Sequence, residues 1–281
     1  MKNFVINPVL NKEFKLRFRS FKSFLGILFY LLALGLIIVG FVFIESLSNT
    51  TGFFKPDQSR TIFIMLSFLQ LALILFITPG LTAGVISSER ERQTLNILLT
   101  TTQSSASIVL SKLISSLSYL LLLIVASLPL YSFVFLFGGI SPGQVLITIS
   151  FYMFTMLVFG SLGVLFSTLI RKTIVSMVTT YGVTLFLAGG TAFLTIIFMQ
   201  FANRYGYSAT PSTNPLPYFT AMLNPAIILF STFEPDFIRE LTTNTGIKFP
   251  LWISYLISYT VIFIAAILLS IKKLRPNMKK G

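Results

Sequence analysis

The sequence has no cysteine and no histidine, and only 10% of its 281 residues are charged. Without these side chains the protein cannot form disulfides, thiolate or imidazole metal sites, or the serine–histidine and cysteine–histidine pairs of nucleophilic catalysis. Soluble domains carry roughly 25% charged residues, so a chain that is 54% hydrophobic could not cover a water-soluble globule of this size. These shortages exclude a soluble enzyme and predict an integral membrane protein.

Long uncharged runs are the first feature that is present. A helix that crosses the bilayer needs about 20 apolar residues, and five uncharged stretches meet this requirement. The longest run is too long for one helix, and the turn-forming sequence Gly138–Gly143 divides it. We therefore expect a single all-α membrane domain over residues 1–281, with spans at 23–44, 61–86, 108–137, 144–170, 173–200 and 250–271.

The distribution of charge predicts the orientation of these spans. With six spans both termini lie on one side, and that side carries 16 of the 21 basic residues but only three of the eight acidic ones. The segments on the other side carry five basic and five acidic residues. Because basic loops remain in the cytoplasm, we expect both termini to be cytoplasmic and the chain to lie in the cell membrane.

Two segments outside the spans have patterns of their own. Residues 1–22 place Leu10, Phe14 and Phe18 on one helical face beside several cations, which predicts an amphipathic elbow helix in the membrane interface. Residues 203–249 contain five prolines and an apolar centre too short to cross the bilayer. A re-entrant or interfacial helical hairpin is expected there, although an ordinary loop that covers the spans has the same composition.

Polar residues within the apolar runs are candidates for a transport path or for helix packing. In the second span Ser67, Gln70 and Thr78 share one helical face. An unpaired amide in lipid is costly, so this stripe is expected to face the path or a neighbouring helix, although the hydroxyls can bond their own backbone. The fifth span has small residues at every fourth position, a spacing that favours close helix packing: Ser176, Thr180, Thr184 and Ala188.

The segment between the second and third spans, residues 87–103, is the most informative. Ser88 and Glu91 form the pattern of a capping box, and leucines follow at helical spacing. We expect a short cytoplasmic helix with a charged beginning and an apolar end. On physical grounds it is either an interfacial helix with a solvated end or a docking element for a soluble partner.

In this segment the sequence resembles the type-2 class of ATP-binding cassette (ABC) transporter permeases, most of which are exporters. Members carry a Glu-Arg-rich turn, a Thr-Leu pair and an apolar pair after the second span. The corresponding residues here are Glu89-Arg90-Glu91-Arg92, Thr94-Leu95 and Leu98-Leu99. The pairs Asn7-Pro8 and Asn224-Pro225 add to the similarity. The sequence departs from the pattern at Gln93, where glycine is common, and at Gln103, where proline is common.

The resemblance implies that the chain is half of a transport path, working with a second permease chain that is identical or related. It implies that residues 87–103 form a coupling helix on a separate ATPase subunit, and that short external helices between the fifth and sixth spans cover the exit. The chain has no phosphate-binding loop, so ATP and Mg are expected on the partner, and no cofactor, metal or nucleic acid on this chain. The expected ATPase contacts are Glu89, Arg90, Glu91, Arg92, Thr94, Leu95 and Leu98.

Two other functions stay open at this point. An ATP-independent carrier is one, although such carriers often show intramembrane charges or internal symmetry, and neither is visible here. The other is a permease that serves metalloenzyme maturation, which the sequence Asn7-Pro8-Val9-Leu10 weakly suggests. A membrane enzyme is disfavoured because there is no histidine and no span carries an acid. The sequence does not identify the transported molecule.

Overall fold

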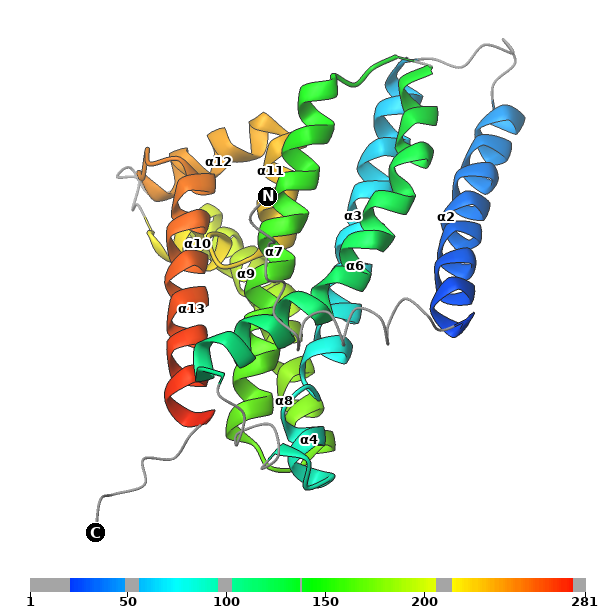
Figure 1. Ribbon diagram of the computed structural model, residues 1–281. Coiled ribbons are helices and arrows are strands. Elements are labelled where there is room, and N and C mark those ends of the chain that lie inside the picture. The colour runs from blue at the N-terminus through cyan, green and yellow to red at the C-terminus, as the bar shows by residue number, and fades with distance from the viewer. Residues whose placement is uncertain (1–20, 49–55, 96–102, 137, 206–213, 275–281) are drawn as a thin grey trace, which may run out of the picture.

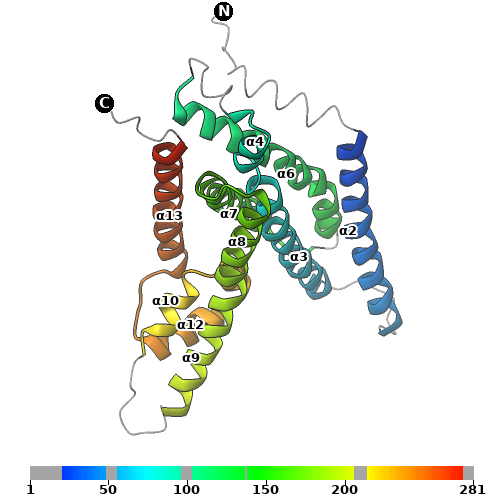
Figure 2. The same cartoon turned by 90° about the horizontal axis from the view of Figure 1, so that it is seen from below.

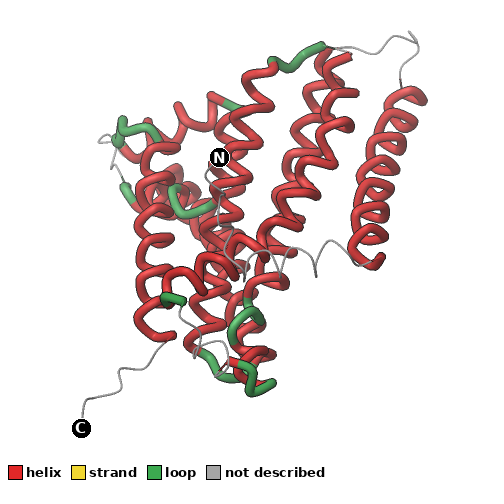
Figure 3. Tube along the Cα trace, viewed as in Figure 1, coloured by secondary structure: helices red, strands yellow, loops and turns green. Residues whose placement is uncertain are grey.

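The computed structural model describes residues 21–48, 56–95, 103–136, 138–205 and 214–274. Every regular element within these residues is a helix, and none is a strand, which confirms the expected all-α class (Figures 1 and 3). The elements are α2 (Phe21–Ser48), α3 (Pro56–Thr82), α4 (Ser87–Glu91), α6 (Ser105–Leu136), α7 (Pro142–Leu169), α8 (Thr173–Leu185), the π-helical turn η1 (Phe186–Gly190), α9 (Thr191–Tyr205), α10 (Leu216–Ala221), α11 (Pro225–Phe233), α12 (Pro235–Thr245) and α13 (Leu251–Leu274).

Within the described residues, six helical stretches are long and apolar enough to cross a membrane, which agrees with the expected number of spans. They lie in α2, in α3 through α4 (Gln58–Glu91), in α6, in α7, in the continuous run α8–η1–α9, and in α13. Helix α3 alone has 27 residues, and at 1.5 Å per residue it measures about 40 Å, against about 30 Å of hydrocarbon. The short helix α4 follows α3 after a turn at residues 83–86.

Helix α7 is the centre of the bundle, in contact with α3, α6, α8 and α13. Two of its glycines allow this close approach. A Cβ on Gly163 would stand 1.9 Å from Thr82 Oγ1 of α3, and a Cβ on Gly160 would stand 2.9 Å from a methyl carbon of Leu117 on α6. Small residues at such contacts are typical of helix packing in membranes. Helix α2 stands apart from the other spans (Figure 1), and among the described residues it packs mainly against α6 and α3.

The turn between α6 and α7 explains why the longest apolar run forms two helices. Gly138 and Gly139 have φ angles of 80° and 88°, a region in which residues with a Cβ are strained. Ser141 then caps α7: its hydroxyl accepts from the backbone amide of Gln144, and the Gln144 side-chain oxygen accepts from the backbone amide of Ser141. Pro142 occupies the first helical position, where its missing N–H is not needed.

Helices α10, α11 and α12 form a compact segment at the end of the bundle opposite α4 (Figure 1). Tyrosine hydroxyls join this segment to α13. Tyr259 donates to the Leu223 carbonyl at 2.8 Å, and the Tyr218 hydroxyl lies 2.6 Å from Ser254 Oγ. Short helices between the fifth and sixth spans were expected, and the structure has three of them. The predicted elbow, residues 1–22, lies outside the described residues except for Phe21 and Lys22, which begin α2.

Candidate functional site

The candidate coupling element begins with α4, which comprises only Ser87–Glu91. The capping box expected at Ser88 is wrong, because the helix begins one residue earlier and no side chain of the segment caps it. The two free amides at this end instead donate across to α7. Ser167 Oγ accepts from the Ile86 amide at 2.8 Å and from the Ser87 amide at 2.9 Å. Ser167, about 80 positions along the chain, therefore supplies the cap that the local sequence pattern predicted at Ser88.

Helix α4 ends in a Schellman motif centred on Gln93, so the helix expected over 87–103 is not continuous. Gln93 has φ 59°, its amide donates to the Arg90 carbonyl at 3.1 Å, and the Thr94 amide donates to the Glu89 carbonyl at 2.9 Å. This geometry favours glycine. Leu95, expected as an anchor in a partner's pocket, is buried in the core of this chain. Leu98 and residues up to 102 lie outside the described residues.

Glu89 pairs within the chain. Its Oε1 lies 3.0 Å from Nζ of Lys112 on α6, and its other oxygen accepts from the Thr94 hydroxyl. Lys112 is only 5% exposed, so this carboxylate compensates a nearly buried cation. Burial alone would raise the pKa of Glu89, but the hydrogen bonds from Thr94 and Lys112 and the nearby positive charges outweigh it and hold the pKa below its ordinary value. The carboxylate therefore stays ionised at neutral pH.

Glu91 caps the fifth span. Its two carboxylate oxygens accept from the Thr173 amide at 2.9 Å and from the Thr173 hydroxyl at 2.7 Å. Thr173 is the first residue of α8, and Lys172 before it provides no side-chain cap. The bonds from the Thr173 amide and hydroxyl lower the pKa of Glu91. Because the folded pKa is lowered, this contact is fully present above the ordinary carboxylate pKa of 4.5 and is lost as the pH falls through the folded value.

Arg90 completes the attachment of α4. Its Nη2 donates at 3.0 Å to the carbonyl of Thr168, at the end of α7. Arg92, by contrast, is exposed. Three of the four charged residues expected to face a partner are thus bonded within the chain, to α6, α7 and α8 in turn. Together, the residues 87–95 and their contacts form a junction of these helices with α4, which we call the α4 junction.

The stripe of small residues on the fifth span is buried within the chain. Ser176, Thr180 and Thr184 are each at most 6% exposed, and α8 contacts α3 and α7. Ser176 Oγ donates to the Ala83 carbonyl just after α3, at 2.7 Å. Ala188, the fourth member, lies in η1. These contacts are within one chain, and packing of this stripe against a second chain remains a prediction.

The stripe on the second span is buried as well. Gln70 is 2% exposed and accepts from the hydroxyl of Tyr30 on α2. Thr78 donates to the Ile74 carbonyl one turn back in its own helix. Ser67 Oγ is buried and has no hydrogen-bond partner among the described residues. In this conformation the stripe faces neighbouring helices, and its role as a path lining remains a prediction.

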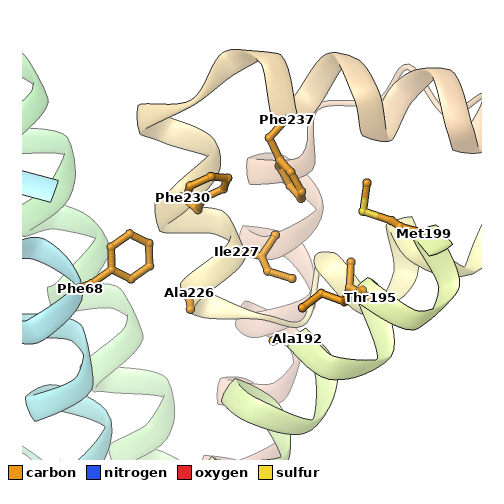
Figure 4. Close-up of a pocket in the computed structure, with 9 residues that line it drawn as sticks. Phe68, Ala192, Thr195, Met199, Ala226, Ile227, Phe230 and Phe237 are labelled. Atoms are coloured by element: carbon orange, nitrogen blue, oxygen red, sulfur yellow. The ribbon is translucent and has the colours of Figure 1, made fainter. Parts of the chain in front are cut away.

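An apolar crevice opens between α9, α11 and α12, with α3 at its side. Figure 4 shows Ile227, Phe230 and Phe237 on one wall, and Thr195 and Met199 on the other. The crevice offers hydrocarbon surface with almost no hydrogen-bonding group, which suits an acyl chain or another apolar moiety. Its lining residues are Phe68, Ala192, Thr195, Ile196, Met199, Ala226, Ile227, Phe230 and Phe237.

Sequence reasoning missed the residues that receive α4. Ser167, Thr168 and Thr173 are ordinary span residues by composition, and nothing local indicates contacts some 80 positions away. Lys112, by contrast, could have been recognised from the sequence. A lysine inside a predicted span, here 108–137, requires a counter-charge, and the nearest acids along the chain are Glu89 and Glu91.

Six apolar helical stretches among the described residues can cross a membrane, and they define an integral membrane protein. Residues 8–272 match the family described as ABC-2 family transporter protein, and the chain belongs to this family. The protein is thus a permease component of an ABC transporter. A search of curated proteins found no matching relative.

Proposed function

We propose that this chain is the membrane-spanning subunit of an ATP-driven exporter. It forms half of the path, assembles with a second permease chain that is identical or related, and docks on a separate ATPase subunit through residues 87–103. Family membership supports the permease role. The excess of basic residues on one side of the bundle supports a cytoplasmic α4 and external α10–α12. ATP and Mg²⁺ are bound by the partner, because this sequence has no phosphate-binding loop.

The attachment of α4 is the observation that carries the proposal. A docking element transmits force only if it is held firmly by the helices that must move. Here Glu89 holds α4 to α6 through Lys112, Ser167 and Thr168 hold it to α7, and Glu91 holds it to α8. When ATP binding draws the two ATPase subunits together, α4 would carry these three spans with it, and hydrolysis would reset them.

The character of the spans bears on the cargo. The crevice beside α9 is apolar, and the residues of the surrounding helices whose burial the structure describes include no buried carboxylate that could mark an ion pathway. An apolar or amphipathic molecule, such as a lipid or a lipid-like compound, is therefore the proposed class of cargo. The absence of such carboxylates among the described buried residues also makes a proton-coupled carrier the weaker reading.

The direct test is co-purification and reconstitution. The tagged chain is expressed with candidate ATPases that contain a phosphate-binding loop, and the complex is placed in liposomes. We expect a stable complex whose ATPase activity requires this chain. If the chain transported cargo without any ATPase, or if no such subunit bound it, the proposal would fail.

A variant pair locates the coupling. Replacing both Glu89 and Glu91 with lysine should break the α4 junction and uncouple ATP hydrolysis from transport in the reconstituted complex. The control is Glu240→Lys, which makes the same Glu-to-Lys exchange once, at an exposed acid on α12, and should leave both activities unchanged. Substrate-stimulated hydrolysis equal to that of the unmodified complex in the Glu89, Glu91 variant would refute the coupling role.

A further inference from the structure

The fifth span contains a break in its helical pattern. Between α8 and α9, residues Phe186–Gly190 form a single π-helical turn. Two of its residues, Gly189 and Gly190, lower the helix propensity of the turn, by about 1 kcal/mol each relative to alanine. Turns of this kind widen the helix locally, leave backbone groups without ordinary partners, and are frequent at functional sites. In an apolar layer such groups need partners from elsewhere.

Asn224 supplies the partners. Its Nδ2 donates to the Ala188 carbonyl of the π-turn at 2.5 Å and to Thr191 Oγ1 at 2.8 Å. Its Oδ1 accepts from the Ile227 amide at 2.9 Å, which caps α11. The side chain is fully buried. The side-chain amide of Asn224 thus caps the N-terminus of α11 with its oxygen and binds the π-turn with its nitrogen.

This contact lies midway along a bonded route across the bundle. At one end of the fifth span, Glu91 caps α8 at Thr173. Farther along the same span, one turn beyond Thr191, Thr195 on α9 donates to Thr220 on α10 at 2.8 Å. Figure 2 shows α8 and α9 as one continuous run. The α10–α12 segment is in turn bonded to α13 through Tyr259.

We propose that Asn224 is a positioning residue that makes the α10–α12 segment follow the π-turn of the fifth span. A displacement of α8 at the α4 junction then reaches the helices at the opposite end of the bundle through this amide, alongside the Thr195–Thr220 bond and the packing of α9 on α10. The proposal rests on the proposed function, because the displacement comes from the ATPase partner. The π-turn is the place where α8 and α9 change their relative angle, and Asn224 holds it against α11.

The variants separate the two roles of the amide. Asn224→Ser keeps an oxygen that can cap α11, but its side chain is too short to reach the Ala188 carbonyl. Thr191→Val is a milder change that removes one acceptor and leaves the bond to Ala188. Ser231→Ala is the matched control: it removes a buried hydroxyl of the same segment that bonds only within α11, to the Ile228 carbonyl.

The measurement is a spin-label distance in the complex with the co-purified ATPase. Because the chain has no native cysteine, cysteines at exposed Val39, Val178 and Phe219 can be labelled pairwise without background. Val39 on α2, a helix that is not bonded to the α4 junction, is the reference, Val178 reports on α8, and Phe219 reports on α10. Distances are compared without nucleotide and with ATP trapped by vanadate.

In the unmodified complex and in Ser231→Ala we expect both distances to shift on trapping. In Asn224→Ser the Val178 distance should still shift, and the Phe219 shift should fall to less than half. The Phe219 shift in Thr191→Val should lie between those of the unmodified complex and Asn224→Ser. If the Phe219 shift in Asn224→Ser equalled that of the unmodified complex, or if Phe219 never moved while Val178 did, the proposal would be overturned.

A second readout needs no partner and separates this proposal from the proposed function. In the isolated chain, labels at Phe193 on α9 and Phe219 on α10, both exposed, report whether the segment is held to the fifth span. We expect a narrow distance distribution in the unmodified chain and in Ser231→Ala, and a broader one in Asn224→Ser. An unchanged width in Asn224→Ser would overturn the positioning role even if ATPase binding were established.

Discussion

Lys112 shows how a single residue can join a cytoplasmic segment to a span. It lies near the start of α6, is almost fully buried, and has the carboxylate of Glu89 at 3.0 Å. Removing one partner of a buried pair leaves an uncompensated charge, which costs about 3–5 kcal/mol. The pair therefore constrains α4 more strongly than an exposed pair of the same two residue types would.

A charge exchange tests this pair. Glu89→Lys alone should lower the thermal stability of the purified protein strongly, because two cations then face each other. Adding Lys112→Glu should restore most of the loss. The control exchange, between Asp236 and Arg239, inverts a pair that is more than 80% exposed and should change stability by less than about 1 kcal/mol. If the exchanged pair were as unstable as Glu89→Lys alone, Glu89 would not depend on Lys112.

Gln93 occupies a position that suits glycine. At φ 59° the backbone of a residue with a side chain is strained by about 1–2 kcal/mol. Glycine would remove this strain, but its greater freedom in the unfolded chain would offset part of the gain in stability. We expect Gln93→Gly to raise the melting temperature by about 2–4 °C. Gln93→Ala keeps the Cβ and should give no gain. Equal melting temperatures for the glycine and alanine variants would contradict this account.

At the scale of helices, the contact between α3 and α7 depends on Gly163. An added methyl group would meet Thr82 at 1.9 Å, so α3 would have to move. Overpacking of this kind costs about 1–3 kcal/mol, and we expect Gly163→Ala to lower the melting temperature accordingly. Gly35→Ala on α2 is the control, since nothing lies within 4 Å of its added methyl.

The outcome for Gly163→Ala has a further check. Combining it with Thr82→Ala removes the hydroxyl that clashes and should recover part of the stability. No effect of Gly163→Ala by itself would mean that α3 and α7 are not as closely packed as their glycine contact indicates.

At the scale of the whole molecule, orientation in the membrane is a prediction from charge, and the absence of native cysteine makes it easy to test. Arg92 and Asp236 are exposed at opposite ends of the bundle. A membrane-impermeant maleimide applied to intact cells should label Asp236→Cys and should label Arg92→Cys only after permeabilisation. The reverse pattern would place α4 outside the cell and would end the coupling proposal.

Much of the fold is readable from local sequence. Five long uncharged runs, one of them divided by a turn, give six spans because a backbone in lipid must satisfy its own hydrogen bonds, and a helix does this without help from other segments. The divided run at Gly138 and Gly139 is also local, because only those residues adopt positive φ easily. The candidate coupling segment was located by its charges, but its helix was predicted too long, since Gln93 gave no sign of a left-handed backbone.

The chain by itself therefore determined the class of protein, the number of its spans and the side on which its positive charge collects. These depend on apolar length and on local charge. Tertiary structure alone decided that Glu91 caps α8, that Lys112 receives Glu89, and that Asn224 joins α11 to the π-turn. Each is a bond between residues from 23 to 82 positions apart, and such a bond forms only when packing of the spans brings its two ends together.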